Sequence, residues 1–115
     1  MVALALINAL AKLYARCLGL VRAEEHSGYT LLVVRRLIPR WAAGQVWGEC
    51  VLVVAPHQNR RGLLAHERVH VAQWRRHGWR FPVLYGWASL TAWWRGEHYY
   101  LDNRFEVEAR RQSGY

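Results

Sequence analysis

Apolar positions in the first half of the chain follow two different patterns. In residues 3–21 they recur at three- or four-residue spacing, which predicts a helix. The runs 30–38 and 46–55 are instead dominated by aliphatic and β-branched residues, which is typical of strands. The connection between them, 39–45, contains proline and glycine. We therefore expect the two runs to be strands that pair as an antiparallel hairpin.

The second half of the chain predicts three helices. Residues 63–77 form the first, and Gly78 provides a natural stop. Pro82 suits the first turn of the second helix, 82–95, which is apolar nearly all round. Such a helix is either buried or in contact with a membrane, and because it is shorter than a membrane span we expect it in the core. The third helix is expected over 103–112.

These elements predict an α+β domain. A small antiparallel sheet, a hairpin or three strands, packs on the helix 63–77, on the apolar helix and on the last helix. A chain of 115 residues suits one domain, 1–115, with an N-terminal helix within 1–22 and the strands within 30–55. Hydrophobic residues make up 53% of the chain, which is enough for a core and excludes a disordered protein.

The chain is strongly basic, with a formal net charge of +8 from fifteen arginines and one lysine against eight acidic residues. This balance favours anionic partners, but the basic residues are spread along the chain and predict a solvated basic surface. A nucleic-acid-binding module is the rival interpretation. Its aromatic and basic patch would be Trp74, Arg75, Arg76, Trp79 and Arg80.

Two segments bear on location. The apolar start of the chain, 1–11, precedes Lys12 and Arg16, which is the reverse of a secretory signal. It is also too short to span a bilayer, so we expect a first helix that packs on the domain, with contact to a membrane surface as the alternative. Of the two cysteines, Cys50 lies in an apolar run and is expected to be a buried thiol. Together these features favour a cytoplasmic protein.

The residues His66-Glu67-Arg68-Val69-His70 form an H-E-x-x-H motif inside a predicted helix. Residues four apart share one face of a helix, so the two imidazoles can bind one cation from the same side. Zinc accepts neutral imidazole nitrogen and prefers four ligands. Glu67 can take a proton from a zinc-activated water and pass it to a leaving amine. The motif predicts one catalytic Zn²⁺ per chain with Glu67 as the general base.

A catalytic zinc ion has three protein ligands, so a third residue must join the two histidines. Glu106 is the main candidate, because it begins the last predicted helix and is followed one turn later by the small residue Ala109. Glu108 is the alternative ligand. Two structural roles for Glu106 stay open, namely a capping box that starts at Asn103 and an ordinary ion pair with Arg110.

The segments HERVHVAQWRRHG and YYLDNRFEVEAR resemble the gluzincin clan of zinc metallopeptidases, and most closely its very short members, the minigluzincins. The resemblance covers about residues 63–111. In that clan the third ligand is a glutamate of an E-x-x-A-D motif, which implies Glu106, while Arg110 stands in place of the usual aspartate. Gln73 also fits the pattern of the small members.

The resemblance further implies a function and an architecture. It implies a peptidase that acts on peptides or proteins, with an edge strand above the zinc that holds an extended peptide. By this analogy the edge strand is 46–54, and the helix within 83–94 forms an apolar floor. Small members of the clan can be latent, which would place the tail 111–115 or the N-terminal helix in the cleft. A zinc protein without catalytic activity is the alternative.

Four residues shortly before the last helix are candidates for supporting roles. His98, Tyr99 and Tyr100 are candidates to stabilise the transition state through hydrogen bonds, although packing on the core is the alternative for the two tyrosines. Asp102 is a candidate partner for a zinc-binding imidazole N–H, and it has an equal claim as the cap of the last helix.

Overall fold

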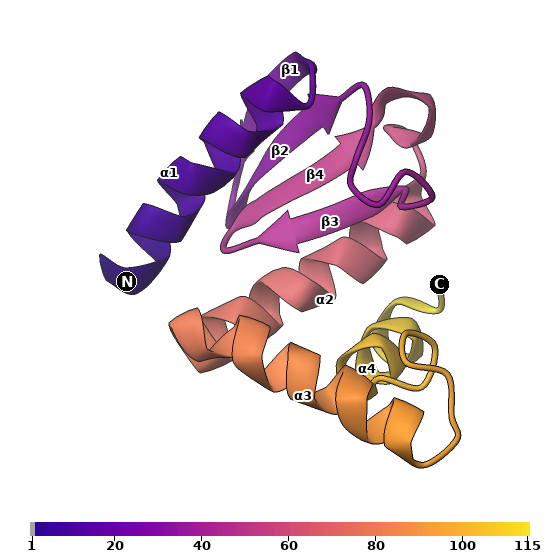
Figure 1. The fold of residues 1–115 in the computed structure, drawn as a ribbon. Helices are drawn as coiled ribbons and strands as arrows, with labels where there is room; N and C mark the ends of the chain where they lie inside the picture. The colour runs from indigo at the N-terminus through magenta and orange to yellow at the C-terminus, as the bar shows by residue number, and fades with distance from the viewer. Residues whose placement is uncertain (1) are drawn as a thin grey trace.

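The computed structural model describes residues 2–115, without the side chains of Val2 and Ala3, and Met1 lies outside it. The chain forms an α+β fold in which helices cover both faces of a four-stranded sheet (Figure 1). The predicted fold class is therefore confirmed. The elements are α1 (Val2–Cys17), β1 (Leu20–His26), β2 (Tyr29–Val34), β3 (Gly44–Trp47), β4 (Cys50–Val54), α2 (Arg61–His77), α3 (Phe81–Trp94) and α4 (Arg104–Ser113), with short 3₁₀ turns at Ala55–His57 and Gly78–Arg80.

The sheet has the strand order β1-β2-β4-β3, and its two central strands are parallel. The expected antiparallel pairing of 30–38 with 46–55 is therefore wrong. The second run is itself a hairpin, because Gly48 takes a positive φ of 62° and reverses the chain between β3 and β4. This turn makes β3 an edge strand and places β4 in the interior, so the edge strand that was expected over 46–54 lies at 44–47.

Both faces of the central strands are buried, which explains their continuous apolar composition. On one face, Leu32 and Leu52 pack with Ala11 and Ala15 of α1. On the other face, Val33 and Val53 pack with residues of α2, including Leu63 and Val71. The sheet therefore lies between most of α1 and α2, whereas Leu4 near the start of α1 packs with Trp74 of α2. The site described below lies on the α2 side.

The helices 63–77, 82–95 and 103–112 are confirmed with small shifts at their ends, whereas the first helix is shorter than expected. It ends at Cys17, and β1 begins at Leu20 after Gly19, whose φ is 82°. The strand β1 was not predicted from the sequence. It is an edge strand with mostly exposed side chains, including Arg22 and Glu25, so it carries no apolar signal.

The apolar helix α3 is not the core helix that its composition predicts. Only Phe81, Ala88 and Ala92 are buried, and most of its large side chains face the solvent. Among the described residues, no helix has the length and apolar character needed to cross a membrane.

Candidate metal centre

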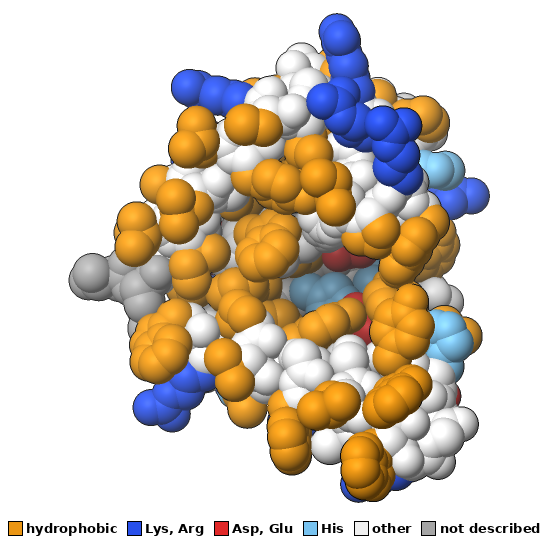
Figure 2. Space-filling view, in the orientation of Figure 1, with side chains coloured by type: hydrophobic (Ala, Val, Ile, Leu, Met, Phe, Trp, Pro, Cys, Tyr) orange, Lys and Arg blue, Asp and Glu red, His pale blue; other side chains and the backbone are white. Residues whose placement is uncertain are grey.

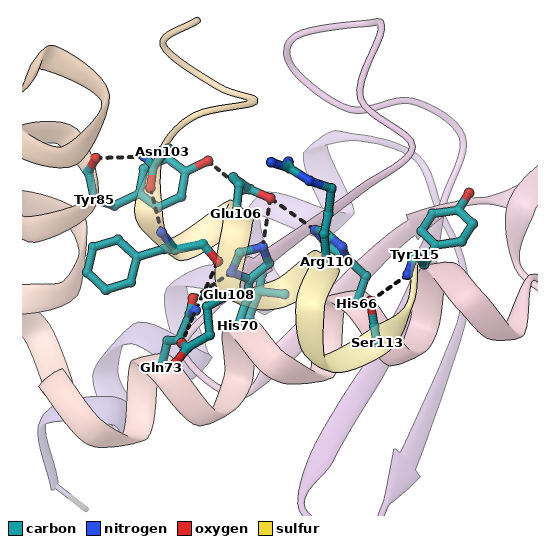
Figure 3. Close-up of polar contacts among 12 residues, drawn as sticks. His66, His70, Gln73, Tyr85, Asn103, Glu106, Glu108, Arg110, Ser113 and Tyr115 are labelled. Carbon is teal, nitrogen blue, oxygen red and sulfur yellow. Dashed lines mark hydrogen bonds and ion pairs between the residues drawn. The ribbon is translucent and has the colours of Figure 1, made fainter. Parts of the chain in front are cut away.

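Helices α2 and α4 bring two histidines and one glutamate together in the interior. His66 and His70 are one turn apart on α2, Glu106 lies in the first turn of α4, and all three side chains are buried. The Nε2 atoms of His66 and His70 lie 3.0 and 3.2 Å from the same Oε1 atom of Glu106. One ligand atom from each residue falls within 4.8 Å of the others, so the group is able to hold a metal ion (Figure 3).

Glu106 is free for this role because another residue caps its helix. The side chain of Asn103 accepts a hydrogen bond of 2.9 Å from the backbone N–H of Phe105, which is the N-cap interaction of α4. The carboxylate of Glu106 turns toward the histidines instead of completing a capping box. Arg110 donates to the carbonyl oxygen of Leu101. Neither structural role considered for Glu106 is therefore its main contact.

Gln73 fixes the orientation of His70 through a chain of hydrogen bonds. The amide nitrogen of Gln73 donates to the carbonyl of Phe105 at 3.0 Å and to the carboxylate of Glu108 at 2.6 Å. The amide oxygen of Gln73 therefore faces the Nδ1 atom of His70, 2.7 Å away, and Nδ1 must be the donor. In the neutral ring this leaves the lone pair on Nε2, which points at the oxygen of Glu106. A cation between these two acceptors, either a proton or a metal ion, stabilises the pair.

Tyr85 of α3 holds the second oxygen of Glu106. Its hydroxyl donates to Oε2 at 2.5 Å, so that Oε1 alone is presented to the histidines. Asn103 ties the same part of α3 to α4 by donating to the carbonyl of Tyr85 and to the hydroxyl of Ser89. Tyr85 was not predicted as part of the site, because its only signal in the sequence is one tyrosine on an otherwise apolar helix.

The electrostatics of the centre follow from burial and from these contacts. Burial alone would raise the pKa of Glu106, but the hydrogen bonds from His66 and His70 hold it well below its usual range. Burial opposes the charged form of His70, yet the hydrogen bond and the charge of Glu106 raise its pKa above the ordinary value. Burial and the charge of Glu106 raise the pKa of Tyr85, which keeps its hydroxyl protonated.

The donor set fits a zinc ion. Adjacent ligand atoms around a tetrahedral zinc ion lie about 3.3 Å apart for ordinary bond lengths, close to the spacings from each histidine to Glu106. The Nδ1 atom of His66 is buried and has no hydrogen-bond partner among the described residues, so the polar contacts of this ring are directed at Glu106. Imidazole nitrogen and carboxylate oxygen are both ligands that zinc accepts in proteins.

Glu67 lies beside this group without belonging to it. It is buried and lines the same cleft as the two histidines. Burial raises the pKa of Glu67 to about 7, and the charges of the histidines only partly offset this effect. A Cβ atom at Gly44 of β3 would lie 2.9 Å from an oxygen of Glu67. The edge strand approaches Glu67 this closely because position 44 has no side chain.

The centre opens to solvent through a cleft with a volume of about 610 Å³. Figure 2 shows histidine and acidic side chains at the bottom of a hollow with hydrophobic side chains around its rim. All four residues of β3 line the cleft, whereas α3 contributes only Phe81, Pro82 and Tyr85. The floor expected from residues 83–94 is therefore limited to the first part of that helix.

The structure separates the remaining candidates. Tyr100 lines the cleft, and burial and the charge of Glu106 raise its pKa, so its hydroxyl stays protonated. Tyr99 is exposed and stacks on His98, whose Nδ1 accepts hydrogen bonds from the backbone N–H groups of Tyr100 and Leu101.

Asp102 and Glu108 have partners outside the metal centre. The carboxylate of Asp102 accepts a hydrogen bond from the backbone N–H of His98. Glu108 accepts from Gln73 and lies 3.6 Å from Arg76. The structure thus brings Glu106, and not Glu108, to the histidines, and Asp102 is not their partner.

The expected aromatic and basic patch is divided between the core and the surface. Trp74 is buried, and its N–H donates to the carbonyl of Val46 at 3.1 Å. Arg75 is paired with Glu49 at 2.8 Å, while Trp79 and Arg80 are exposed. Trp74 therefore offers no surface on which a base could stack.

Comparison with protein-family models, with curated proteins and with solved structures finds no match to this chain.

Proposed function

We propose that the protein is a zinc-dependent metallopeptidase of the gluzincin type. The observation that carries the proposal is the convergence of His66 and His70 on one oxygen of Glu106, with Glu67 buried beside them in the same cleft. His66, His70 and Glu106 would hold the zinc ion. A set of three protein ligands is typical of catalytic zinc sites, since structural sites usually have four.

Glu67 is suited to carry the proton in peptide hydrolysis. When bound, zinc supplies Lewis acidity, which polarises a carbonyl group and makes water more acidic. Glu67 accepts a proton from the attacking water and later donates it to the nitrogen of the leaving amine. The hydroxyl of the water ends on the carbonyl carbon. A carboxyl group whose pKa is raised to about 7 by burial can both accept and donate a proton near neutral pH.

The edge strand β3 is the expected binding site for the substrate. It pairs with β4 on one side only, and its four residues line the cleft beside Glu67. An extended peptide can add to such an edge through backbone hydrogen bonds, which do not depend on its sequence. The aromatic lining of the cleft, which includes Trp41 and Phe81, favours hydrophobic side chains in the substrate. Tyr100 lines the cleft and keeps its hydroxyl protonated, so it is the candidate donor for a developing oxyanion.

The C-terminal residue provides a reason to expect latency. Tyr115 lines the cleft, and its ring lies 6.3 Å from that of His66. A Cβ atom at Gly62 would lie 2.4 Å from this ring, so Tyr115 packs directly over the first turn of α2. Helix α1 packs on the opposite face of the sheet. The tail is therefore a better candidate than the N-terminal helix for limiting access to the cleft.

The substitution Glu67→Gln tests this function. We expect the variant to bind one zinc ion per chain, as the wild type does, and to hydrolyse peptides about 10²- to 10⁴-fold more slowly, because the general base is lost. Zinc is measured by elemental analysis, and turnover by a fluorogenic peptide library. The same substitution at the exposed Glu97 is the matched control and should leave both quantities unchanged.

Each outcome of this test is informative. Unchanged hydrolysis in the Glu67→Gln variant would contradict the role of Glu67. If the full chain binds zinc but is inactive, the same assay on a chain that lacks Gly114 and Tyr115 separates latency from inactivity. Zinc binding without hydrolysis in the trimmed chain would leave a metal protein without catalytic activity and would refute the peptidase proposal.

A further inference from the structure

Helix α3 presents a continuous apolar face to the solvent. Its sequence from Phe81 to Trp94 contains no charged residue. Four large side chains recur at intervals of four, three and four residues and therefore lie along one side of the helix, here called the α3 face. It consists of Val83, Trp87, Leu90 and Trp94, which are 69%, 64%, 49% and 81% exposed. Isolated exposed apolar residues are ordinary, but an aligned row with two tryptophans indicates a contact surface.

Helix α1 has a similar second face. Its inward residues Ala11 and Ala15 pack on the sheet. Leu6, Leu10 and Leu13 are spaced by four and three residues, and each is more than half exposed. Like α3, this helix contains no acidic residue. Figure 2 shows hydrophobic side chains gathered along the positions of α1 and α3 and around the hollow, with lysine and arginine side chains toward the periphery.

The charges near the α3 face identify the partner that it fits. Exposed arginines, Arg80 and Arg95, flank the helix at its two ends. A net charge of +8 opposes association with a second copy of the chain but attracts an anionic surface. Tryptophan combines an apolar ring with a polar N–H and is the residue most typical of the boundary between lipid and water. Arginines beside such a boundary interact with anionic headgroups.

We infer that the α3 face docks on the surface of an anionic lipid bilayer, with its tryptophans in the interfacial region and Arg80 and Arg95 among the headgroups. Helix α3 would lie parallel to the membrane plane, because the apolar residues of this face extend along its whole length and an exposed arginine flanks each end. The inference does not depend on the proposed peptidase activity. If both hold, the cleft would act on peptides close to a membrane.

Cosedimentation of the full chain with vesicles tests the inference. Vesicles of phosphatidylcholine with an equal amount of phosphatidylglycerol are compared with vesicles of phosphatidylcholine alone. We expect binding to the anionic vesicles that weakens as salt is raised. Val83→Asp should lower this binding about tenfold or more, because it places a carboxylate in the docked face. The matched control is Val21→Asp on β1, where the valine is 52% exposed. Strand β1 lies on the other side of the molecule from α3 (Figure 1).

A second pair of substitutions tests the electrostatic part. Arg80→Gln and Arg95→Gln should each lower binding to anionic vesicles about fivefold and should leave the weak binding to neutral vesicles unchanged. Circular dichroism and thermal unfolding establish that each variant is folded. The inference is wrong if the wild type does not bind anionic vesicles, or if Val83→Asp and Val21→Asp weaken binding equally. It is also wrong if light scattering shows a dimer that Val83→Asp dissociates while vesicle binding is absent.

Discussion

Helices α2 and α3 reverse the usual relation between polarity and burial. Helix α2 buries two histidines, a glutamate and a glutamine, namely His66, His70, Glu67 and Gln73. Helix α3 is composed of apolar, aromatic and small residues and exposes most of its large side chains. In most domains the first composition would face the solvent and the second would form the core. The two helices are consecutive in the chain, and both contribute to one cleft.

The stability of the fold alone explains neither the buried polar side chains of α2 nor the exposed tryptophans of α3. A buried polar group destabilises a protein unless it is hydrogen-bonded, and the groups of α2 are joined to α4 and α3 through Gln73, Glu106 and Tyr85. In the part of the chain that the structure describes, the exposed tryptophans of α3 have no comparable partners. Metal binding at the three buried side chains would account for the first departure, and the proposed contact with a lipid surface would account for the second.

Removing the residue that joins α4 to the buried histidines should have the largest effect. Glu106→Ala deletes a proposed zinc ligand. Loss of a residue that only supports a ligand lowers metal affinity by about 10- to 100-fold, so we expect the loss of the ligand itself to lower zinc affinity by more than about 100-fold. Glu108→Ala removes a partner of Gln73 and should lower the affinity about tenfold. Competition with a zinc-binding dye measures both values. A larger loss in the Glu108 variant would overturn the choice of ligand.

The second effect concerns the buried charge of Glu67 in the metal-free protein. Its pKa is about 7 in the fold against an ordinary value of 4.5, so between these pH values the folded state binds more protons than the unfolded state. The free energy of unfolding should therefore fall as pH rises through this window, by at most on the order of 3 kcal/mol. Glu67→Gln cannot ionise and should remove this slope.

Urea unfolding at pH 5 and pH 8, with a chelator present, measures the difference between wild type and Glu67→Gln. The variant should gain stability relative to the wild type as pH rises. Parallel pH profiles would mean that Glu67 is not held in a desolvated position. Lowering the pH should also weaken zinc binding, because a proton competes for the nitrogen of His70 that faces Glu106.

A smaller effect is expected at the contact between α3 and the metal centre. Tyr85→Phe keeps the ring but removes the hydrogen bond to the second oxygen of Glu106. We expect zinc affinity to fall about tenfold, which is typical for loss of a group that orients a ligand. The control is Tyr99→Phe, since Tyr99 is exposed and stacks on His98. Equal affinities in the two variants would show that Tyr85 does not orient the glutamate.

The sequence predicted the centre of the site because its signal is local. His66 and His70 share a helix face, and the helix 63–77 was readable from its periodicity. Glu106 was also predicted, but its distance from the histidines depends on how α4 packs, which no local pattern determines. Tyr85 was missed for the same reason, since its role exists only where α3 meets α4. In the chain of hydrogen bonds from His70 through Gln73 to Glu108, the first link is local to α2, but the link from Gln73 to Glu108 joins residues distant in sequence.

The sheet was harder to predict than the helices. The fold class was predictable from the apolar runs. The pairing of the strands was not, because it depends on contacts between residues distant in sequence. A single glycine, Gly48, divides one apolar run into two strands and makes the central pair parallel. Strand β1 has no apolar alternation because its side chains are mostly exposed. The burial of α3 was predicted wrongly because composition alone cannot separate a core helix from one that contacts another surface.

The smallest effect is expected for a substitution that tests whether α3 is exposed or buried. Trp94 is the most exposed large hydrophobic side chain of α3, at 81%. Trp94→Ser should change the free energy of unfolding by no more than about 0.5 kcal/mol, as expected for a surface substitution. A tryptophan packed in a core would instead stabilise the fold by about 3–5 kcal/mol. Urea unfolding of the zinc-free protein measures the difference. If Trp94→Ser lowers the free energy of unfolding by several kcal/mol, α3 packs against the domain through this residue. Helix α3 would then be an ordinary core helix, and only the buried polar side chains of α2 would still need an explanation.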